Sequence, residues 1–186
     1  MFIVSVYFKV AFALITVGLV FELIGFASPY WVSYDYYDTN FGLWQHCSDT
    51  NRVYRNNDRC VEFGANTAIK AARAFSAIAL ILFVILVILL LVYWCQCPRS
   101  DLILASIIIS FITAACVFIG IICFVSSYNG SLSWAFYLCV IAGILAIVGG
   151  ILLIPERRII VIGRTTTTGG GTQVRTVTTT RTVTVR

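Results

Sequence analysis

The chain of 186 residues is 60% hydrophobic and only 11% charged, and its mean hydropathy is +0.94. So apolar a composition excludes an ordinary soluble domain, because the few polar side chains could not shield the others from water. The composition instead predicts a protein that folds in a lipid bilayer.

Four apolar stretches follow one another along the chain. Each reaches or exceeds the roughly 20 residues that a helix needs to cross about 30 Å of hydrocarbon. Each is predicted to be helical, because lipid offers no partner to an unpaired backbone N–H or C=O group. The predicted helices cover residues 7–27, 68–94, 102–125 and 132–154. The first is interpreted as a retained helix and not a signal peptide, since Lys9 follows eight uncharged residues instead of opening a basic segment.

Basic residues fall on both sides of these predicted membrane spans. Lys9, Arg99 and the C-terminal arginines lie on one side. The opposite side carries Arg52, Arg55, Arg59, Lys70 and Arg73. The count favours cytosolic N- and C-termini, because Lys and Arg accumulate in cytoplasmic loops.

Residues 28–67, between the first two helices, are the only part outside the membrane that is predicted to fold. Runs of aromatic and β-branched residues alternate there with turn-forming Asn, Asp and Ser. The predicted strands cover residues 31–37, 41–47 and 52–55, and a fourth begins at residue 59. The expected result is a small antiparallel sheet, which is marginally stable unless a covalent link supports it.

Cys47 and Cys60 flank two of these strands, so a hairpin could bring their sulfur atoms together. A disulfide would stabilise the loop by about 3 kcal/mol in the chain-entropy model, provided that the loop faces an oxidising compartment. The alternatives are two free thiols in a cytosolic loop and a zinc site that also uses His46. The zinc site lacks a fourth ligand and the usual ligand spacing.

The same loop carries Trp31, then Gly42-Leu43-Trp44, Cys47 and Cys60. With the four-helix layout, this pattern resembles the signature of the superfamily of claudins, peripheral myelin proteins and epithelial membrane proteins. The Ala-Arg-Ala around Arg73 is similar to the stretch that opens the second claudin helix. The resemblance covers about residues 1–155. It implies an all-α membrane protein, a left-handed bundle of four transmembrane helices with a small disulfide-stapled extracellular antiparallel β-sheet.

The resemblance also implies a role for the three large signature residues. Trp31, Leu43 and Trp44 are expected to pack the base of the sheet onto the helix ends, at a depth that favours aromatic side chains in any case.

Two basic residues, Lys70 and Arg73, lie three positions apart near the outer end of the second helix. Glu22 of the first helix is a candidate partner for either. The alternative is that both basic side chains snorkel to the lipid headgroups.

Acidic residues of the loop are candidates for setting ion selectivity, because loop charges do so in claudin-like pores, where a ring of one sign attracts counter-ions. The loop arginines oppose them, so a neutralising solvated surface is the alternative. The candidates are Asp35, Asp38, Asp49, Asp58 and Glu62.

Cys95 and Cys97 lie where the second helix is expected to leave the membrane on the cytosolic side. Juxtamembrane cysteines accept palmitoyl groups, and many claudins are acylated at this position. Free thiols are the alternative. Packing alone is assigned to the cysteines within apolar helices, Cys116, Cys123 and Cys139.

Residues 156–186 are predicted to form a disordered, basic, Thr-rich cytosolic tail. The chain ends at Arg186, without the hydrophobic residue that PDZ grooves accept in many claudins, so recruitment by that route is not expected. The glycosylation pattern at Asn129 lies too close to both helix ends to be used.

The predicted function is that of a claudin-like structural membrane protein of cell–cell contacts or a paracellular barrier, acting by lateral association. Expected partners are membrane lipids, further copies of the chain and other claudin-like proteins, in the plasma membrane and at cell junctions. The alternative is an auxiliary subunit that modulates a channel or receptor, as stargazin-like proteins do. The sequence shows no nucleotide-binding loop, catalytic dyad or metal cluster, so no enzymatic activity, cofactor or nucleic-acid partner is expected.

Overall fold

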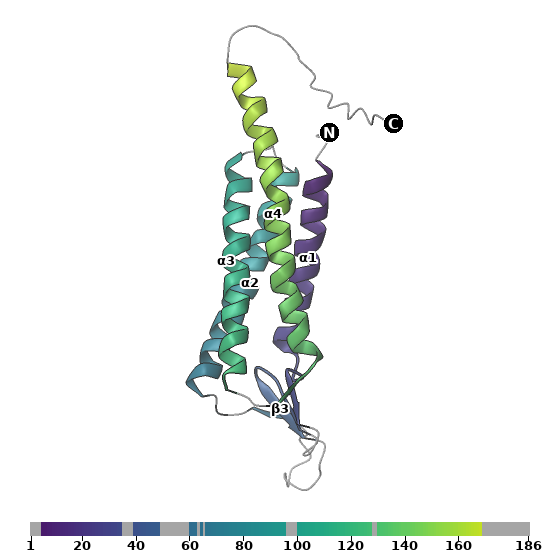
Figure 1. The fold of residues 1–186 in the computed structure, drawn as a ribbon, viewed down its shortest axis with the longest axis vertical. Coiled ribbons are helices and arrows are strands. Elements are labelled where there is room, and N and C mark those ends of the chain that lie inside the picture. The colour runs from purple at the N-terminus through teal and green to yellow at the C-terminus, as the bar shows by residue number, and fades with distance from the viewer. Residues whose placement is uncertain are drawn as a thin grey trace, which may run out of the picture.

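The computed structural model describes residues 5–34, 39–48, 60–62, 64, 66–95, 100–127 and 130–168, without the side chains at 48, 61, 62, 100 and 158–168. Four long helices dominate this part of the chain (Figure 1): α1 (Val6–Ala27), α2 (Thr67–Cys95), α3 (Ser100–Val125) and α4 (Trp134–Thr168). All four are long and apolar enough to cross a membrane, as predicted.

The ends of α1 illustrate how local sequence sets a helix boundary. The Ser5 hydroxyl caps the first turn by accepting a 3.3 Å hydrogen bond from the backbone N–H of Phe8. At the other end the N–H of Ser28 donates to the carbonyl of Ile24 at 3.0 Å. Pro29 follows and cannot continue the helix, so the chain turns into the loop.

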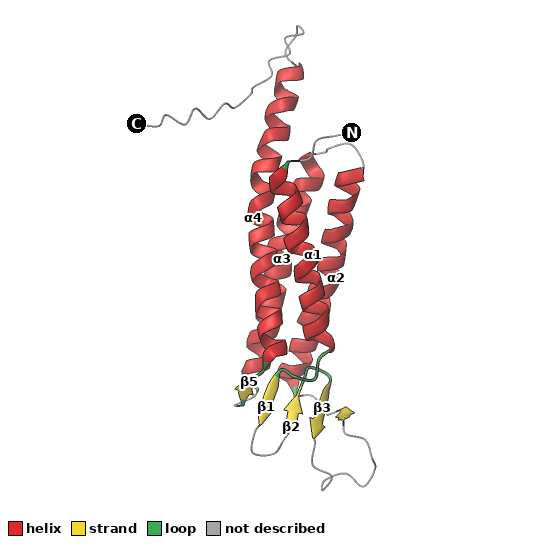
Figure 2. Ribbon diagram, turned by 90° about the vertical axis from the view of Figure 1, so that its right-hand side faces the viewer, coloured by secondary structure: helices red, strands yellow, loops and turns green. Residues whose placement is uncertain are grey.

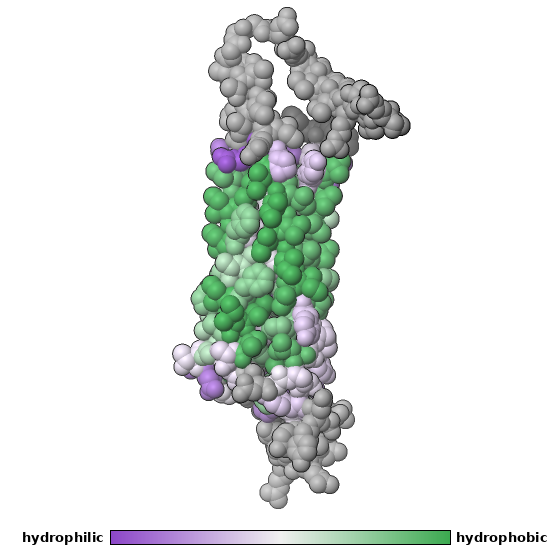
Figure 3. Space-filling view, viewed as in Figure 1, coloured by the Kyte–Doolittle hydropathy of each residue, from purple (hydrophilic) through white to green (hydrophobic). Residues whose placement is uncertain are grey.

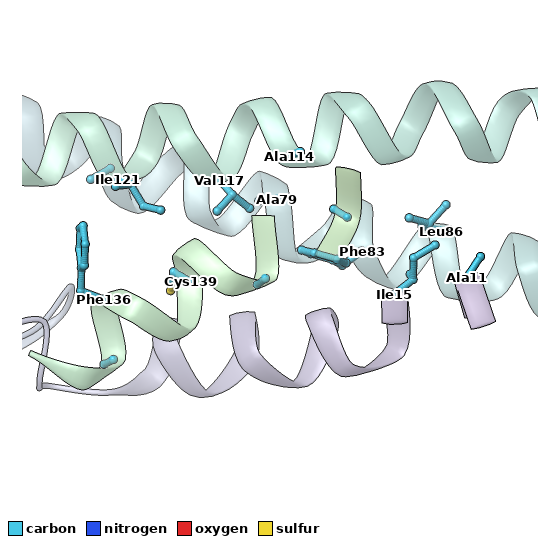
Figure 4. Close-up of a cluster of buried hydrophobic side chains, with 14 of the residues drawn as sticks. Ala11, Ile15, Ala79, Phe83, Leu86, Ala114, Val117, Ile121, Phe136 and Cys139 are labelled. Carbon is cyan, nitrogen blue, oxygen red and sulfur yellow. The ribbon is translucent and has the colours of Figure 1, made fainter. Parts of the chain in front are cut away.

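The helices pack as a ring in which α1 contacts α4, α4 contacts α3 and α3 contacts α2, while α1 and α2 are packed less closely. Small residues bring α1 and α4 together. A Cβ atom on Gly25 would lie 2.3 Å from Cys139 Sγ, and one on Gly149 would lie 2.6 Å from Ile15 Cγ1. Figure 4 shows Ile15 and Cys139 among the buried side chains between the helices.

The surface of the bundle that faces away from the other helices is apolar. Ile81 of α2 is 60% exposed and Ile122 of α3 is 67% exposed. Figure 3 shows a continuous hydrophobic band with hydrophilic side chains at both of its ends. Such a surface needs lipid around it, so the chain is a multi-pass membrane protein.

A five-stranded antiparallel sheet lies beyond one end of the bundle (Figure 2). Its strands stand in the spatial order β4-β3-β2-β1-β5. They are β1 (Val32–Tyr34), β2 (Thr39–Phe41), β3 (Gln45–Ser48), β4 (Cys60–Glu62) and β5 (Ser131–Leu132). The predicted antiparallel sheet is confirmed.

The strand boundaries differ from the predicted ones in one important place. The single strand predicted at residues 41–47 is two strands, β2 and β3, because the chain turns at Gly42-Leu43-Trp44. Thr39 and Asn40, which lie between the first two predicted strands, belong to β2. The strand predicted at 52–55 and the predicted start of the fourth strand at residue 59 lie outside the described residues, within which β4 begins at Cys60.

The short connection between α3 and α4 also contributes to the sheet. Helix α4 begins at Trp134 and not at residue 132, because Ser131 and Leu132 pair with Ser33 and Val32 of β1. A two-residue strand carries no periodicity of its own, which is why the sequence does not reveal it.

Helix α4 extends further than predicted at its other end. We expected it to end at residue 154 and a disordered tail to begin at 156, but the helix continues through Pro155 to Thr168. Pro155 removes one backbone hydrogen bond and favours a bend, but the next residue, Glu156, is held by Ser5 at the start of α1 and by Tyr93 of α2. The remainder of the predicted tail lies outside the described residues.

Candidate functional site

Trp31 lies where the sheet meets three helices. Its side chain is fully buried, and its indole N–H donates a 2.7 Å hydrogen bond to the carbonyl of Gly25 in the last turn of α1. Its ring packs against Phe124 of α3 and Phe136 of α4, with centroids 4.6 Å and 6.3 Å away. The backbone N–H of Trp31 donates to the carbonyl of Phe41 at 3.0 Å. Trp31 therefore joins the start of the sheet to the bundle.

The turn formed by Gly42, Leu43 and Trp44, called the tryptophan turn below, is the second attachment of the sheet to the bundle. The N–H of Gly42 donates to the carbonyl of Gln45 at 2.9 Å and closes the turn. A Cβ atom on Gly42 would lie 2.4 Å from the Cα atom of Pro29 and so would overlap backbone. Glycine is required here by this close approach to the connection between α1 and β1.

We expect Gly42→Ala to destabilise the fold by about 1–3 kcal/mol, because the added methyl group forces the turn away from Pro29. Thermal unfolding of the purified protein in detergent measures this loss. Gly64→Ala is the matched control, since a Cβ atom on Gly64 meets nothing within 4 Å. Equal unfolding temperatures for the two variants would contradict the prediction, because they would show that the turn shifts to accommodate the methyl group without loss of stability.

Arg73 of α2 holds the same turn from the other side. Its Nε donates a 2.7 Å hydrogen bond to the carbonyl of Leu43, whose side chain is buried. Its guanidinium carbon lies 5.1 Å from the centroid of the Trp44 ring, which also meets Phe26 of α1 edge to face at 5.3 Å. One basic side chain therefore links α2 to the tryptophan turn through a charge-assisted hydrogen bond and a cation–π contact.

Replacing Arg73 by methionine is expected to cost about 1–3 kcal/mol, because the Leu43 carbonyl loses its donor while the length of the side chain is kept. Arg73→Lys should lose less, since an ammonium group can still donate to the carbonyl. Lys70→Met is a suitable control, because Lys70 is exposed one turn earlier on α2. A Lys70→Met effect as large as that of Arg73→Met would contradict this role.

Glu22 does not pair with Arg73 or Lys70, so that prediction is wrong. Glu22 is 1% exposed, and its carboxyl group lies beside the Cys139 thiol of α4. Its Oε2 atom has no hydrogen-bond partner among the described residues. The physical reason is the rotation of α1, which turns Glu22 towards α4, whereas Arg73 reaches towards the tryptophan turn. Cys139, to which the sequence assigned packing alone, therefore has a polar contact as well.

Cys47 and Cys60 form the predicted disulfide, so the free-thiol and zinc alternatives are wrong. The two residues face each other directly across β3 and β4, and their Cα atoms lie 4.1 Å apart. The bond therefore links the edge strand β4 to the part of the sheet that the tryptophan turn anchors. His46, the neighbour of Cys47, stacks on Phe41 with ring centroids 5.6 Å apart.

The connection between α3 and α4 supports the same end of the bundle, which the sequence did not indicate. The N–H of Ser133 donates to the carbonyl of Trp31 at 2.9 Å, and the N–H of Ala135 donates to that of Tyr30 at 3.2 Å. The rings of Tyr30 and Trp134 stack with their centroids 5.9 Å apart. These bonds tie the first turn of α4 to the chain that enters β1.

Several of the remaining candidates lie outside the described residues. Cys95 is the last residue of α2 and is exposed, but Cys97 is not described. The backbone of Glu62 lies in β4 without a described side chain, and the other loop acids, Asp35, Asp38, Asp49 and Asp58, are not described. The roles suggested for all of these residues stay predictions.

Comparison with known proteins agrees with this arrangement of helices, sheet and disulfide. A search of curated proteins finds no match to the chain. The family model described as PMP-22/EMP/MP20/Claudin matches residues 3–153, which include α1 to α3, the five strands and most of α4. The chain therefore belongs to the PMP-22/EMP/MP20/claudin family.

Proposed function

We propose that the chain is a structural membrane protein of cell–cell contacts or a paracellular barrier that acts by lateral association. The observation that carries this proposal is the double attachment of the sheet to the bundle, by Trp31 and by the turn that Arg73 holds. Two attachments keep the sheet from swinging on a single connection. A sheet fixed in this way can meet a neighbouring molecule at a defined height above the membrane.

The orientation that this function needs has the sheet outside the cell and both termini in the cytosol, in the plasma membrane. The Cys47–Cys60 disulfide supports it, because disulfides persist in oxidising compartments and are rare in the cytosol. The exposed Cys95 at the opposite end of α2 then lies at the inner membrane surface, where palmitoylation takes place. The loop acids would face the extracellular space and remain our candidates for ion selectivity.

The apolar outer surface of the bundle supports association within the membrane plane. Large side chains such as Ile78, Ile108 and Ile151 are 46–51% exposed and are available to lipid or to another transmembrane protein. Neighbouring copies of the chain or other claudin-like proteins are the proposed partners. The proposed role is structural and not catalytic.

Imaging of tagged protein in contacting cells that lack endogenous claudins tests the proposal. We expect the protein to concentrate where two expressing cells touch. Trp31→Ala, which removes one attachment of the sheet, should abolish this enrichment, whereas Lys70→Met should not. An even distribution over the surface of contacting cells would contradict the proposal.

An auxiliary role beside a channel or receptor is the second candidate. The short connection between α3 and α4 favours this candidate. Its strand β5 pairs with β1 of the same chain, so few residues of the connection remain that could contact a protein on an opposing cell. A subunit of this kind should follow its partner in the membrane. Co-purification of a channel or receptor from cells in which the tagged protein is not enriched at contacts would favour this candidate.

A further inference from the structure

A polar cluster lies at the end of the bundle opposite the sheet, where Ser5, the N-cap residue of α1, meets Tyr93 of α2 and Glu156 of α4. Glu156 of α4 is 6% exposed and Tyr93 of α2 is 5% exposed. The Tyr93 hydroxyl donates to Glu156 Oε1 at 3.1 Å, and the Ser5 hydroxyl donates to Glu156 Oε2. Both oxygen atoms of one buried carboxyl group are therefore hydrogen-bonded, each to a different helix.

A carboxyl group is an expensive choice for this position. Burying it costs free energy that its hydrogen bonds offset only in part, and an apolar residue of similar size would pack there without that cost. Apolar contacts are not directional, whereas a hydrogen bond fixes the position of the group that it binds. The carboxyl group of Glu156 therefore makes sense as a positioning group.

The surroundings of the cluster favour the same interpretation. The ring of Phe8 packs on Tyr93 with centroids 4.9 Å apart, and Trp94 meets Phe8 edge to face at 6.1 Å. The Ser5 hydroxyl donates to Glu156 while it caps the first turn of α1. The start of α1 and the last turn of α2 are thus both tied to one residue of α4.

Two features of the bundle bear on what the cluster can do. Helices α1 and α2 are packed less closely than the other neighbouring pairs. Pro155 removes one backbone hydrogen bond from α4, directly before Glu156, and prolines are where helices bend. Beyond this level α4 continues to Thr168, past the described ends of the other three helices (Figures 1 and 2).

We propose that Ser5, Tyr93 and Glu156 form a clamp that holds the ends of α1, α2 and α4 together and limits the bending of α4 at Pro155. The clamp sets the direction in which α4 leaves the bundle. It is separate from the anchor of the sheet, because it lies at the other end of the same helices. Opening it should loosen this end and leave the sheet end unchanged.

Distances between spin labels on α1 and α3 of the full chain, measured by pulsed electron resonance in lipid nanodiscs, test the clamp. One pair, at Val6 and Ile108, reports the clamp end, and a second pair, at Leu23 and Ile122, reports the sheet end. All four sites are exposed. The labels require a background that keeps the disulfide and lacks the other cysteines, Cys95, Cys97, Cys116, Cys123 and Cys139.

Tyr93→Phe and Glu156→Leu should broaden the distance distribution of the clamp-end pair and shift it to longer distances. The sheet-end pair should not change. Ser110→Ala is the matched control, because it removes a hydroxyl bond between α3 and α4 that is not part of the clamp. It should leave the clamp-end distribution unchanged.

Two results would overturn the proposal. One is an unchanged clamp-end distribution in both variants, which would mean that the cluster positions nothing. The other is equal broadening at both ends, which would mean that the substitutions loosen the whole bundle. Tyr93→Phe keeps the ring that packs on Phe8, so it carries the test alone if Glu156→Leu does not fold.

Discussion

Replacement of Trp31 by alanine is expected to destabilise the protein by about 3–5 kcal/mol, the largest loss that we predict for a single substitution. The indole is fully buried, so its removal leaves a cavity between α1, α3 and α4. The carbonyl of Gly25 loses its donor at the same time. Thermal unfolding in detergent and the fraction of protein that reaches the cell surface measure the effect.

Two further substitutions separate the contributions of the tryptophans. Trp31→Phe keeps an aromatic ring but loses the N–H that donates to Gly25. It should lower the free energy of unfolding by about 1–2 kcal/mol. Trp44→Ala should also cost less than Trp31→Ala, because Trp44 is 38% exposed. If Trp44→Ala proved the more damaging of the two, Trp31 would not be the principal anchor of the sheet.

Removal of the disulfide is expected to have the second largest effect. The double variant Cys47→Ser, Cys60→Ser should lose about 3 kcal/mol, because the unfolded chain regains the entropy that closure of the loop removes. The double variant is preferable to either single one, which would leave a reactive thiol. Thermal unfolding with and without a reducing agent gives the comparison.

The location of the cysteines makes this prediction specific. Reduction should lower the unfolding temperature of the natural chain, because it breaks the disulfide between β3 and β4. The unfolding temperature of the double variant should not change, because that variant has no such bond to reduce. The free cysteines that the structure describes lie in the helices. A natural chain that is insensitive to reduction would contradict a stabilising role for this bond.

The fold was predictable from the sequence to the extent that lipid dictates it. A helix that crosses a bilayer must satisfy every backbone group internally, so long apolar stretches identify it without reference to any partner. The strand signals around Val32 and Cys60 and the pairing of Cys47 with Cys60 were likewise local in origin. These predictions needed only the order of residues along the chain.

Contacts that depend on helix rotation were not predictable in the same way. Glu22 and Arg73 lie at similar distances from their helix ends, which suggested a pair, but α1 turns Glu22 to Cys139 and Arg73 binds the Leu43 carbonyl. The turn at Gly42 was hidden inside an apparently continuous strand, since its reason is the nearby backbone of Pro29. Spacing along one element does not reveal which neighbour it faces.

The continuation of α4 failed to be predicted for a related reason. Pro155 and the change in composition after it are both typical of a helix end. Glu156, the residue that follows, is held by Ser5 and Tyr93, which lie far away in the sequence. Long-range contacts of this kind override a local stop signal.

The measurement that tests the proposed function most directly is the electrical conductance across a monolayer of claudin-deficient epithelial cells that express the chain. We predict that expression changes the conductance and that Trp31→Ala removes this change, because a sheet without its anchor cannot hold neighbouring molecules in register. A conductance that stays at the level of untransfected cells, with the protein present at the surface, would contradict a role in a paracellular barrier.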